Sequence, residues 1–381
     1  MAPVGRSGAV HGTRALSRNG SPDGGIRPVT GPALGTGRWE RHVESGPTGR
    51  RGYAVYTPRG LPPGRPVPLV VVLHGCRQSA EDAAAGTGVN VLADRAGFVA
   101  LYPEQRRSDN VRRCWNWFDP RHQSRGAGEP ADIAQVTERV LSGAGGAGVR
   151  LDRDRVHAMG LSAGGAMAGI LAATYPDLYA SVGIHSAPQY GAARSTATAL
   201  LAMRTAGPQP ERQGALAHAA MGPRARVVPV VVFQGDADRT VRPRNGSSVV
   251  RQWLTTARLA ADAASASGAA VRLDSAGPPS VRTGRTTAGL SYRVRTWADA
   301  AGQPVVEYWL VSGLGHAWSG GTPAGSFTDP RGPSATEAMY AFFQASPRNR
   351  QGVARGAGQP TARSAVGRGV RRLQRWLRPH G

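Results

Sequence analysis

The serine at position 162 has the sequence surroundings of a nucleophile. It is the central residue of Gly-Leu-Ser-Ala-Gly at 160–164, which follows a short apolar run and precedes small, helix-compatible residues. A strand that turns sharply into a helix holds a serine hydroxyl clear of the sheet, and so tight a turn leaves no room for a Cβ at Gly160 or Gly164. The first amides of the helix then point at whatever binds beside Ser162. The pattern predicts a nucleophile elbow, with a chance match in a glycine-rich chain as the alternative.

A hydroxyl is a poor nucleophile at neutral pH and needs a base within hydrogen-bond reach. His316 follows an apolar run at 305–311, in a Gly-Leu-Gly-His turn that lets the ring point back over a sheet edge. His157 lies inside an apolar run and His74 lies beside the predicted oxyanion loop, which favours structural roles for both. We predict His316 as the base, with His185 as an outside alternative.

The base requires a carboxylate that selects its tautomer and stabilises the imidazolium. Asp236 and Asp238 both lie in the loop after the apolar run at 227–233. Asp238 is favoured because Gly-x-x-Asp-x-x-Val is the loop form of serine hydrolases with this order of residues, which leaves Asp236 as a turn or supporting residue. The order serine, aspartate, histidine is typical of α/β-hydrolases.

The oxyanion that forms when a serine attacks a carbonyl needs two amide donors. The Ala163 N–H follows the predicted nucleophile, and the second donor is expected in His-Gly-Cys at 74–76, with the Cys76 amide as the candidate. Cys76 and Cys114 are the only cysteines, and a disulfide between them would join this loop to a tryptophan-rich segment. The sequence leaves that disulfide open, because it does not reveal the redox compartment.

Aromatic residues near these motifs form a further group of candidates. Trp115, Trp117 and Phe118 lie in a long loop at 104–130, and a loop of this length inside a compact domain is more often functional than idle. Their side chains either anchor the loop in the core or form a wall of an acyl or polymer pocket. We predict Trp115 and Trp117 as substrate-binding residues, together with Trp318.

Apolar runs alternate with segments of helical periodicity along most of the chain. Strands are predicted at 37–44, 51–57, 69–73, 98–102, 156–159, 182–184, 227–233, 292–297 and 305–311. Helices are predicted at 89–96, 133–141, 163–175, 248–259 and 336–343, whereas 260–288 has no readable pattern. This alternation predicts an α/β fold with a mostly parallel central sheet flanked by helices. Ser162, Asp238 and His316 then follow the carboxyl ends of strands, where open α/β sheets bind ligands.

The composition divides the chain into three parts. Residues 1–36 are predicted to form a disordered arm and residues 37–345 the α/β domain. Residues 346–381 are predicted to be a basic, mostly disordered tail. The alternative is a short amphipathic helix near the C-terminus that makes weak contact with an anionic surface. Its basic residues are Arg371, Arg372, Arg375 and Arg378, which surround Leu373, Trp376 and Leu377.

The formal net charge of +23 arises from arginine, since the sequence contains no lysine. Within the predicted domain the arginines are scattered and no nucleic-acid-binding motif accompanies them, so a compositional bias explains the charge better than a nucleic-acid partner does. Two cysteines exclude a disulfide-rich scaffold and a four-thiolate zinc site, and no metal or cofactor is predicted. No apolar run approaches the roughly 20 residues of a transmembrane helix.

Five segments together resemble the poly(3-hydroxybutyrate) depolymerase-type esterases of the α/β-hydrolase superfamily. They are His-Gly-Cys at 74–76, Cys-Trp-Asn-Trp-Phe at 114–118, the elbow at 160–165, the aspartate loop at 235–241 and Gly-Leu-Gly-His-Ala-Trp-Ser-Gly-Gly at 313–321 with Phe-Thr-Asp-Pro at 327–330. The resemblance covers roughly 37–345 and extends more distantly to feruloyl and acetylxylan esterases. It implies an α/β-hydrolase fold and cofactor-free hydrolysis of short hydroxyacyl polyesters or oligomers. Ser162 would be the nucleophile, Asp238 the orienting acid and His316 the base.

The resemblance leaves the substrate and the compartment open. Gln234 stands where relatives often carry histidine, a departure that need not affect the triad. No polymer-binding domain and no signal peptide are recognisable, which favours soluble esters over crystalline polymer. Feruloyl or acetylxylan ester cleavage is the alternative activity, and a non-catalytic binding protein or a polyanion binder are alternatives of other classes. The family suggests an extracellular protein, but no signal peptide is visible before residue 37, so a cytoplasmic protein is the other expectation.

Overall fold

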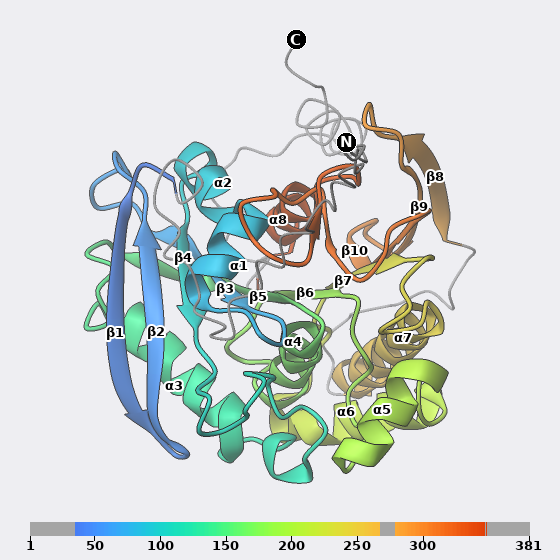
Figure 1. The fold of residues 1–381 in the computed structure, drawn as a ribbon. Coiled ribbons are helices and arrows are strands. Elements are labelled where there is room, and N and C mark those ends of the chain that lie inside the picture. The colour runs from blue at the N-terminus through green and yellow to red at the C-terminus, as the bar shows by residue number, and fades with distance from the viewer. Residues whose placement is uncertain (1–34, 267–278, 347, 349–381) are drawn as a thin grey trace, which may run out of the picture.

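The centre of the molecule is a ten-stranded sheet in the order β1-β2-β4-β3-β5-β6-β7-β10-β9-β8 (Figure 1). The computed structural model describes residues 35–266, 279–346 and 348. The strands of this sheet are β1 (Arg38–Gly46), β2 (Gly49–Thr57), β3 (Val67–Leu73), β4 (Val99–Pro103), β5 (Leu151–Leu161), β6 (Ser181–His185), β7 (Val230–Gly235), β8 (Ser280–Arg285), β9 (Ser291–Ala298) and β10 (Pro304–Val311). A two-stranded parallel sheet of β11 (Trp318–Ser319) and β12 (Thr328–Asp329) lies apart from it.

The sheet is parallel in its middle and antiparallel at both ends. Strands β4, β3, β5, β6, β7 and β10 run parallel, whereas β1, β2 and β4 pair antiparallel at one end and β10, β9 and β8 do so at the other. Every residue of β3 is buried, as expected of a continuous apolar strand that is covered on both faces. The edge strands β1 and β8 keep exposed positions throughout their length.

Helices cover both faces of the sheet, so the domain has three layers (Figure 1). They are α1 (Ala80–Thr87), α2 (Val89–Ala96), α3 (Gly128–Leu141), α4 (Ala163–Thr174), α5 (Thr196–Thr205), α6 (Pro210–Met221), α7 (Arg244–Ala266) and α8 (Ala335–Gln344), with short 3-10 turns at Pro120–His122 and Gly222–Arg224. Side chains of α3, α4, α6 and α7 share one core cluster, and those of α1, α2 and α8 share another. Alternate residues of β3 enter the two clusters, because successive side chains of a strand point to opposite faces.

The predicted α/β architecture with a mostly parallel sheet is confirmed. Each predicted strand and helix corresponds to an observed element, although β5 and α7 are longer than predicted. Six of the observed helices and strands have no counterpart in the prediction, namely α1, α5, α6, β8, β11 and β12. Helix α5 explains one of these omissions, because it exposes Leu200 and Leu201 and buries the alanines at 199 and 202, which removes the usual apolar stripe.

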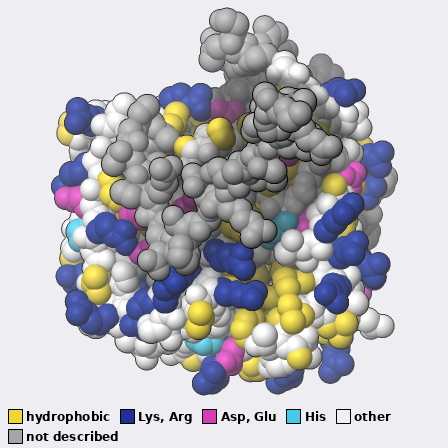
Figure 2. Space-filling view, viewed as in Figure 1, with side chains coloured by type: hydrophobic (Ala, Val, Ile, Leu, Met, Phe, Trp, Pro, Cys, Tyr) yellow, Lys and Arg dark blue, Asp and Glu magenta, His cyan; other side chains and the backbone are white. Residues whose placement is uncertain are grey.

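The basic side chains of the described residues are dispersed over the visible surface and form no single patch there (Figure 2). Figure 2 shows dark blue basic side chains spread around the visible face, in keeping with the scattered arginines of the sequence. Most of the predicted arm at 1–36 and of the tail at 346–381, including Arg371 to Arg378, lies outside the described residues. Within the described ranges, none of the helices has the length and apolar character needed to span a bilayer.

Candidate active site

Ser162 lies in a strained turn between β5 and α4. Its backbone has φ 57° and ψ −120°, a left-handed conformation that non-glycine residues seldom adopt. A Cβ built at Gly160 would lie 2.5 Å from the carbonyl carbon of Gly164, and one at Gly164 would lie 2.1 Å from the Leu73 carbonyl oxygen. The Ser162 N–H donates to the His185 carbonyl oxygen at 2.9 Å. The structure thus has the sharp strand-to-helix turn that the sequence predicts.

His316 and Asp238 are in direct contact. His316 follows β10, Asp238 follows β7, and the His316 Nδ1–Asp238 Oδ2 distance is 2.8 Å. The carboxylate is fully buried, and its Oδ1 accepts hydrogen bonds from the Thr240 and Val241 amides at 2.9 Å each. Because a carboxylate accepts hydrogen bonds, this contact assigns the proton to Nδ1 of neutral His316 and leaves Nε2 able to accept another.

The three predicted residues follow the carboxyl ends of parallel strands that lie close together in the sheet. Strands β5, β6, β7 and β10 are consecutive neighbours, and Ser162, Asp238 and His316 follow the first, third and fourth of them. The side chains of Asp238 and His316 form a hydrogen bond, and Ser162 lies at the same edge of the sheet, in the turn between β5 and α4. This is the edge at which open α/β sheets bind ligands.

Two polar side chains support the aspartate loop. Asp236 Oδ1 accepts a hydrogen bond from the Gly313 amide at 2.7 Å, which ties this loop to the turn that precedes His316. Gln234 Nε2 donates to the carbonyl oxygens of Val241 at 3.1 Å and Gly235 at 3.2 Å, and lies 3.4 Å from Asp238 Oδ2. Asp236 therefore acts as the turn and supporting residue, and Gln234 closes the loop around the carboxylate.

His185, the alternative base, is occupied by structural contacts. Its Nε2 accepts the Ser319 amide at 3.1 Å, and its Nδ1 lies 3.0 Å from the Ser186 hydroxyl. The ring stacks against Phe233 and Trp318, and burial lowers the pKa of His185 to about 3. A buried, neutral imidazole with both nitrogens engaged cannot collect a proton from Ser162.

The His-Gly-Cys loop leaves one amide free for an oxyanion. The Gly75 N–H donates to Gln78 Oε1 at 2.8 Å, and the amide of Arg77, directly after Cys76, donates to the Arg112 carbonyl oxygen at 2.7 Å. Among the described residues, neither the Cys76 N–H nor the Ala163 N–H has a hydrogen-bond partner. These are the two donors that the sequence predicts for the oxyanion hole.

A disulfide joins Cys76 to Cys114, and so links the oxyanion loop to the long loop at 104–127. Three further contacts support the link. The Trp115 indole N–H donates to the His74 carbonyl oxygen at 3.1 Å. The Gln105 amide donates to His74 Nε2 at 3.0 Å, and His74 Nδ1 lies 2.8 Å from the Gly75 carbonyl oxygen. His74 is thus a buried neutral histidine that orients the loop, as the sequence suggested.

A buried polar network lies beneath this link, and the sequence analysis missed it. Glu129 accepts hydrogen bonds from the Asn116 amide at 2.7 Å, from the Asn116 side chain at 2.6 Å and from the Gln105 side chain. Arg51 is 1% exposed and donates to Gln105 Oε1 at 2.8 Å and to Asp132 Oδ2 at 2.8 Å. No pattern in the sequence marks these residues, because their partners lie tens of residues apart.

The predicted substrate-binding tryptophans are all buried, with Trp115 at 0%, Trp117 at 6% and Trp318 at 1% exposure. Trp115 therefore takes the anchoring role, one of the two that the sequence left open, and Trp117 packs into the same core cluster. Trp318 donates its indole N–H to the Thr336 hydroxyl at 2.9 Å and stacks on His185. Trp115 and Trp117 are thus packed in the core, whereas Trp318 also lines a small cavity beside the elbow. Substrate contact by these indoles stays a prediction.

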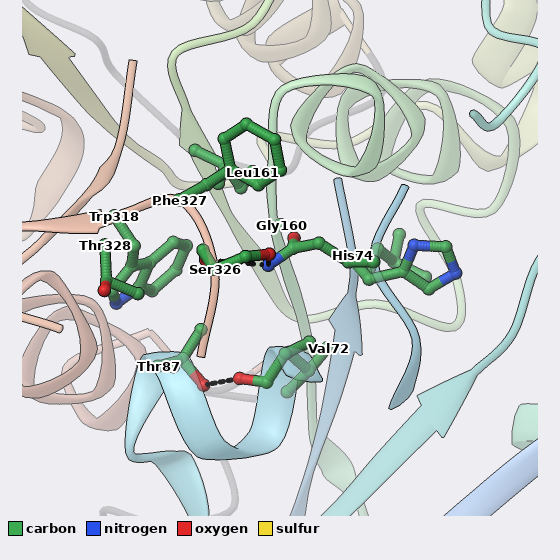
Figure 3. A pocket seen from close by; sticks show the side chains of 13 residues that line it. Val72, His74, Thr87, Gly160, Leu161, Trp318, Ser326, Phe327 and Thr328 are labelled. Carbon is green, nitrogen blue, oxygen red and sulfur yellow. Dashed lines mark hydrogen bonds between the residues drawn. The ribbon is translucent and has the colours of Figure 1, made fainter. Parts of the chain in front are cut away.

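A small cavity lies between the ends of β3 and β5, helix α1 and the loop that follows His316 (Figure 3). The lining includes His74, Gly160, Leu161, Trp318 and Phe327, so it adjoins both the oxyanion loop and the elbow. Within the described ranges, no group of three or more His, Cys, Asp or Glu side chains is arranged to hold a metal ion.

A mostly parallel sheet covered on both faces, a strained serine elbow and an aspartate–histidine pair at its carboxyl edge define the α/β-hydrolase class. An acetyl xylan esterase from Aspergillus awamori has this fold, with a TM-score of 0.61 at 20% identity over 81% of this chain and 100% of that chain. The sequence profile described as "Esterase PHB depolymerase" matches residues 51–275. The chain therefore belongs to this esterase family.

The relatives that are similar in sequence are named as esterases of different substrate classes. Poly(3-hydroxyalkanoate) depolymerase C of Paucimonas lemoignei is 32% identical over 273 residues, which cover 70% of this chain and 58% of the relative. Feruloyl esterase B of Neurospora crassa is 32% identical over 194 residues, which cover 49% of this chain and 63% of the relative. The matched regions thus span about three-fifths of these relatives' length.

Proposed function

We propose that the protein hydrolyses carboxylic esters of short-chain hydroxyacyl oligomers or polyesters, with Ser162 as nucleophile. The observation that carries the proposal is the hydrogen bond between Asp238 and His316 at the sheet edge that also holds the strained Ser162 elbow. Membership of the depolymerase esterase family and the relative named a poly(3-hydroxyalkanoate) depolymerase support the substrate class.

The reaction begins when His316 Nε2 removes the proton of the Ser162 hydroxyl and the oxygen attacks the ester carbonyl carbon. Asp238 holds the imidazole in the required tautomer and stabilises its protonated form. The Cys76 and Ala163 amides donate to the oxyanion of the tetrahedral intermediate. His316 then returns the proton to the departing alcohol and an acyl-enzyme remains. Water, activated by the same histidine, attacks the acyl group and releases the acid and the free serine.

The nucleophile is tested by Ser162→Ala. Hydrolysis of p-nitrophenyl butyrate should fall at least about a thousandfold, because the acyl-enzyme can no longer form and only binding and the oxyanion donors contribute. The variant should keep the melting temperature of the wild type. Turnover at the wild-type rate would disprove the serine mechanism.

Cleavage of feruloyl or acetylxylan esters is the second candidate, supported by the feruloyl esterase relative at 32% identity. One purified preparation should be incubated with hydroxybutyrate oligomers and, separately, with methyl ferulate and acetylated xylan. Mass spectrometry of the products then decides between them. Release of hydroxybutyrate monomers and dimers at the higher kcat/KM supports our proposal, and faster release of ferulate or acetate supports the second candidate.

A further inference from the structure

Phe327 is an exposed aromatic residue in an unfavourable backbone conformation. Its φ is 54°, and 41% of its surface is exposed. A bulky residue in the left-handed region is strained, and burial of the ring in a core would be the ordinary compensation. Here the ring is not in the core, so neither backbone preference nor packing accounts for a phenylalanine at this position.

Contacts on both sides of Phe327 hold the strained conformation in place. The Phe327 carbonyl oxygen accepts the Trp318 amide at 2.7 Å, and the next residue pairs with Trp318 in the β11–β12 sheet. On the other side, the Ser326 amide donates to Asp82 Oδ1 at 2.9 Å. Strain that the surroundings maintain in this way is characteristic of functional sites.

The same contacts connect Phe327 to the oxyanion loop through Gln78. Gln78 Oε1 accepts the Gly75 amide at 2.8 Å, and Gln78 Nε2 donates to the Ser326 carbonyl oxygen at 3.0 Å and to Asp82 Oδ2 at 2.7 Å. Gln78 is 4% exposed, so this bridge is part of the interior. The position of Phe327 is therefore coupled to that of the loop that carries the Cys76 amide.

Phe327 and Leu161, the residue that precedes Ser162, both contribute to the small cavity (Figure 3). Both side chains line the small cavity together with His74 and Gly160. The cavity thus adjoins the two residues that precede Ser162 and the histidine that begins the His-Gly-Cys loop. An exposed aromatic face there offers apolar contact to an acyl chain.

We propose that Phe327 is a specificity-determining residue whose ring contacts the acyl chain of the ester bound at Ser162. The inference rests on the proposed ester hydrolysis and adds to it the residue that selects acyl length. A butyryl chain gains more contact with the ring than an acetyl group does, because contact energy grows with the apolar area removed from water.

The test compares Phe327→Gly and Phe327→Asn with the wild type, since both replacements tolerate the left-handed backbone and remove the ring. We expect the ratio of kcat/KM for p-nitrophenyl butyrate to that for p-nitrophenyl acetate to fall about tenfold, mainly through KM, which corresponds to about 1.4 kcal/mol. The melting temperature should stay constant or rise. Phe327→Tyr should keep the wild-type ratio.

Ala206→Gly is the matched control, because Ala206 also has a positive φ, of 73°, at the end of α5. It should raise the melting temperature without changing the ratio. If Phe327→Gly loses kcat/KM equally on both esters and has a lower melting temperature, Phe327 is a packing residue and the inference is wrong. An unchanged ratio of kcat/KM for the two esters would also overturn it. Absence of hydrolysis of either ester by the wild type would refute the proposed function instead.

Discussion

The two sides of the candidate site are held in place by different means. On the acid–base side, Asp238 is oriented by the amides of Thr240 and Val241 in its own turn, and one long-range hydrogen bond joins it to His316. On the oxyanion side, a disulfide spans a sequence separation of 38 residues, and hydrogen bonds to His74 come from residues 31 and 41 positions away. On the first side each turn is held by its own residues and hydrogen bonds join the Asp238 turn to the His316 turn, whereas the second side depends on a disulfide and on side chains from the long loop.

This difference indicates where each side is vulnerable. The acid–base side has a single essential contact, so one substitution removes its function without disturbing its surroundings. The oxyanion side distributes its support over a disulfide, an indole hydrogen bond and the buried network of Arg51 and Glu129. Loss of any one support should weaken this side only partly, since the other contacts remain.

The largest effect is expected from Asp238→Asn. An amide in place of the carboxylate favours the wrong tautomer of His316 and removes the charge that stabilises the imidazolium, so kcat should fall by roughly 10³ to 10⁴. Steady-state hydrolysis of p-nitrophenyl butyrate measures this. Asp236→Asn is the matched control, because Asp236 accepts a hydrogen bond from the Gly313 amide at 2.7 Å, whereas His316 is bonded to Asp238. Equal losses in the two variants would contradict the assignment of Asp238.

An intermediate effect is expected when Cys76 and Cys114 are both replaced by serine. An oxyanion donor contributes about a hundredfold to kcat, and partial loss of its alignment should reduce kcat about tenfold with little change in KM. Removal of this cross-link should also lower the free energy of unfolding by up to about 4 kcal/mol in the chain-entropy model. Stopped-flow kinetics and urea unfolding measure the two effects, and an unchanged kcat would show that the disulfide does not align the oxyanion loop.

The smallest effect is expected on the pH dependence of stability, through the buried histidines His185 and His74. Burial lowers the pKa of His185 to about 3 and also lowers that of His74, so both are neutral in the folded protein. As the pH falls below the ordinary value of about 6.5, the unfolded chain binds protons that the folded protein does not, and stability is lost. For His185 the loss at pH 5 is about 2 kcal/mol.

His185→Gln should therefore flatten the dependence of the free energy of unfolding on pH between about 6.5 and 3, whatever its effect at neutral pH. Urea unfolding at pH 7, 6 and 5 measures the slope. The same slope in the variant and the wild type would mean that His185 does not titrate as its burial requires.

The acid–base side could be predicted from the sequence because its signals are local. Gly-x-Ser-x-Gly requires a tight turn, Gly-x-x-Asp-x-x-Val encloses a carboxylate with its own amides, and the glycines before His316 permit the turn that presents it. The structure contains each of these turns, at Ser162, Asp238 and His316. The Ala163 amide was predictable for the same reason, because it follows Ser162, and the Cys76 amide was predictable from its place in the loop after the apolar run at 69–73.

The roles of aromatic residues could not be predicted in this way. Trp115, Trp117 and Trp318 are close to the motifs in the sequence, yet the fold buries their rings. The sequence singled out Phe327 only as part of a family motif, yet this residue is 41% exposed and lines the cavity next to the elbow. Whether an aromatic ring anchors a loop or lines a site depends on the direction of its side chain, which local sequence does not specify.

The sequence by itself determined most of the strands and helices and the three turns that carry Ser162, Asp238 and His316, because turn chemistry and apolar periodicity act over a few residues. Only the tertiary structure decided that Cys76 meets Cys114, that Arg51 and Glu129 lie beneath the oxyanion loop, and that Phe327 faces outward. These contacts join segments that are distant in the chain, and their stability depends on packing that exists only after the sheet has assembled.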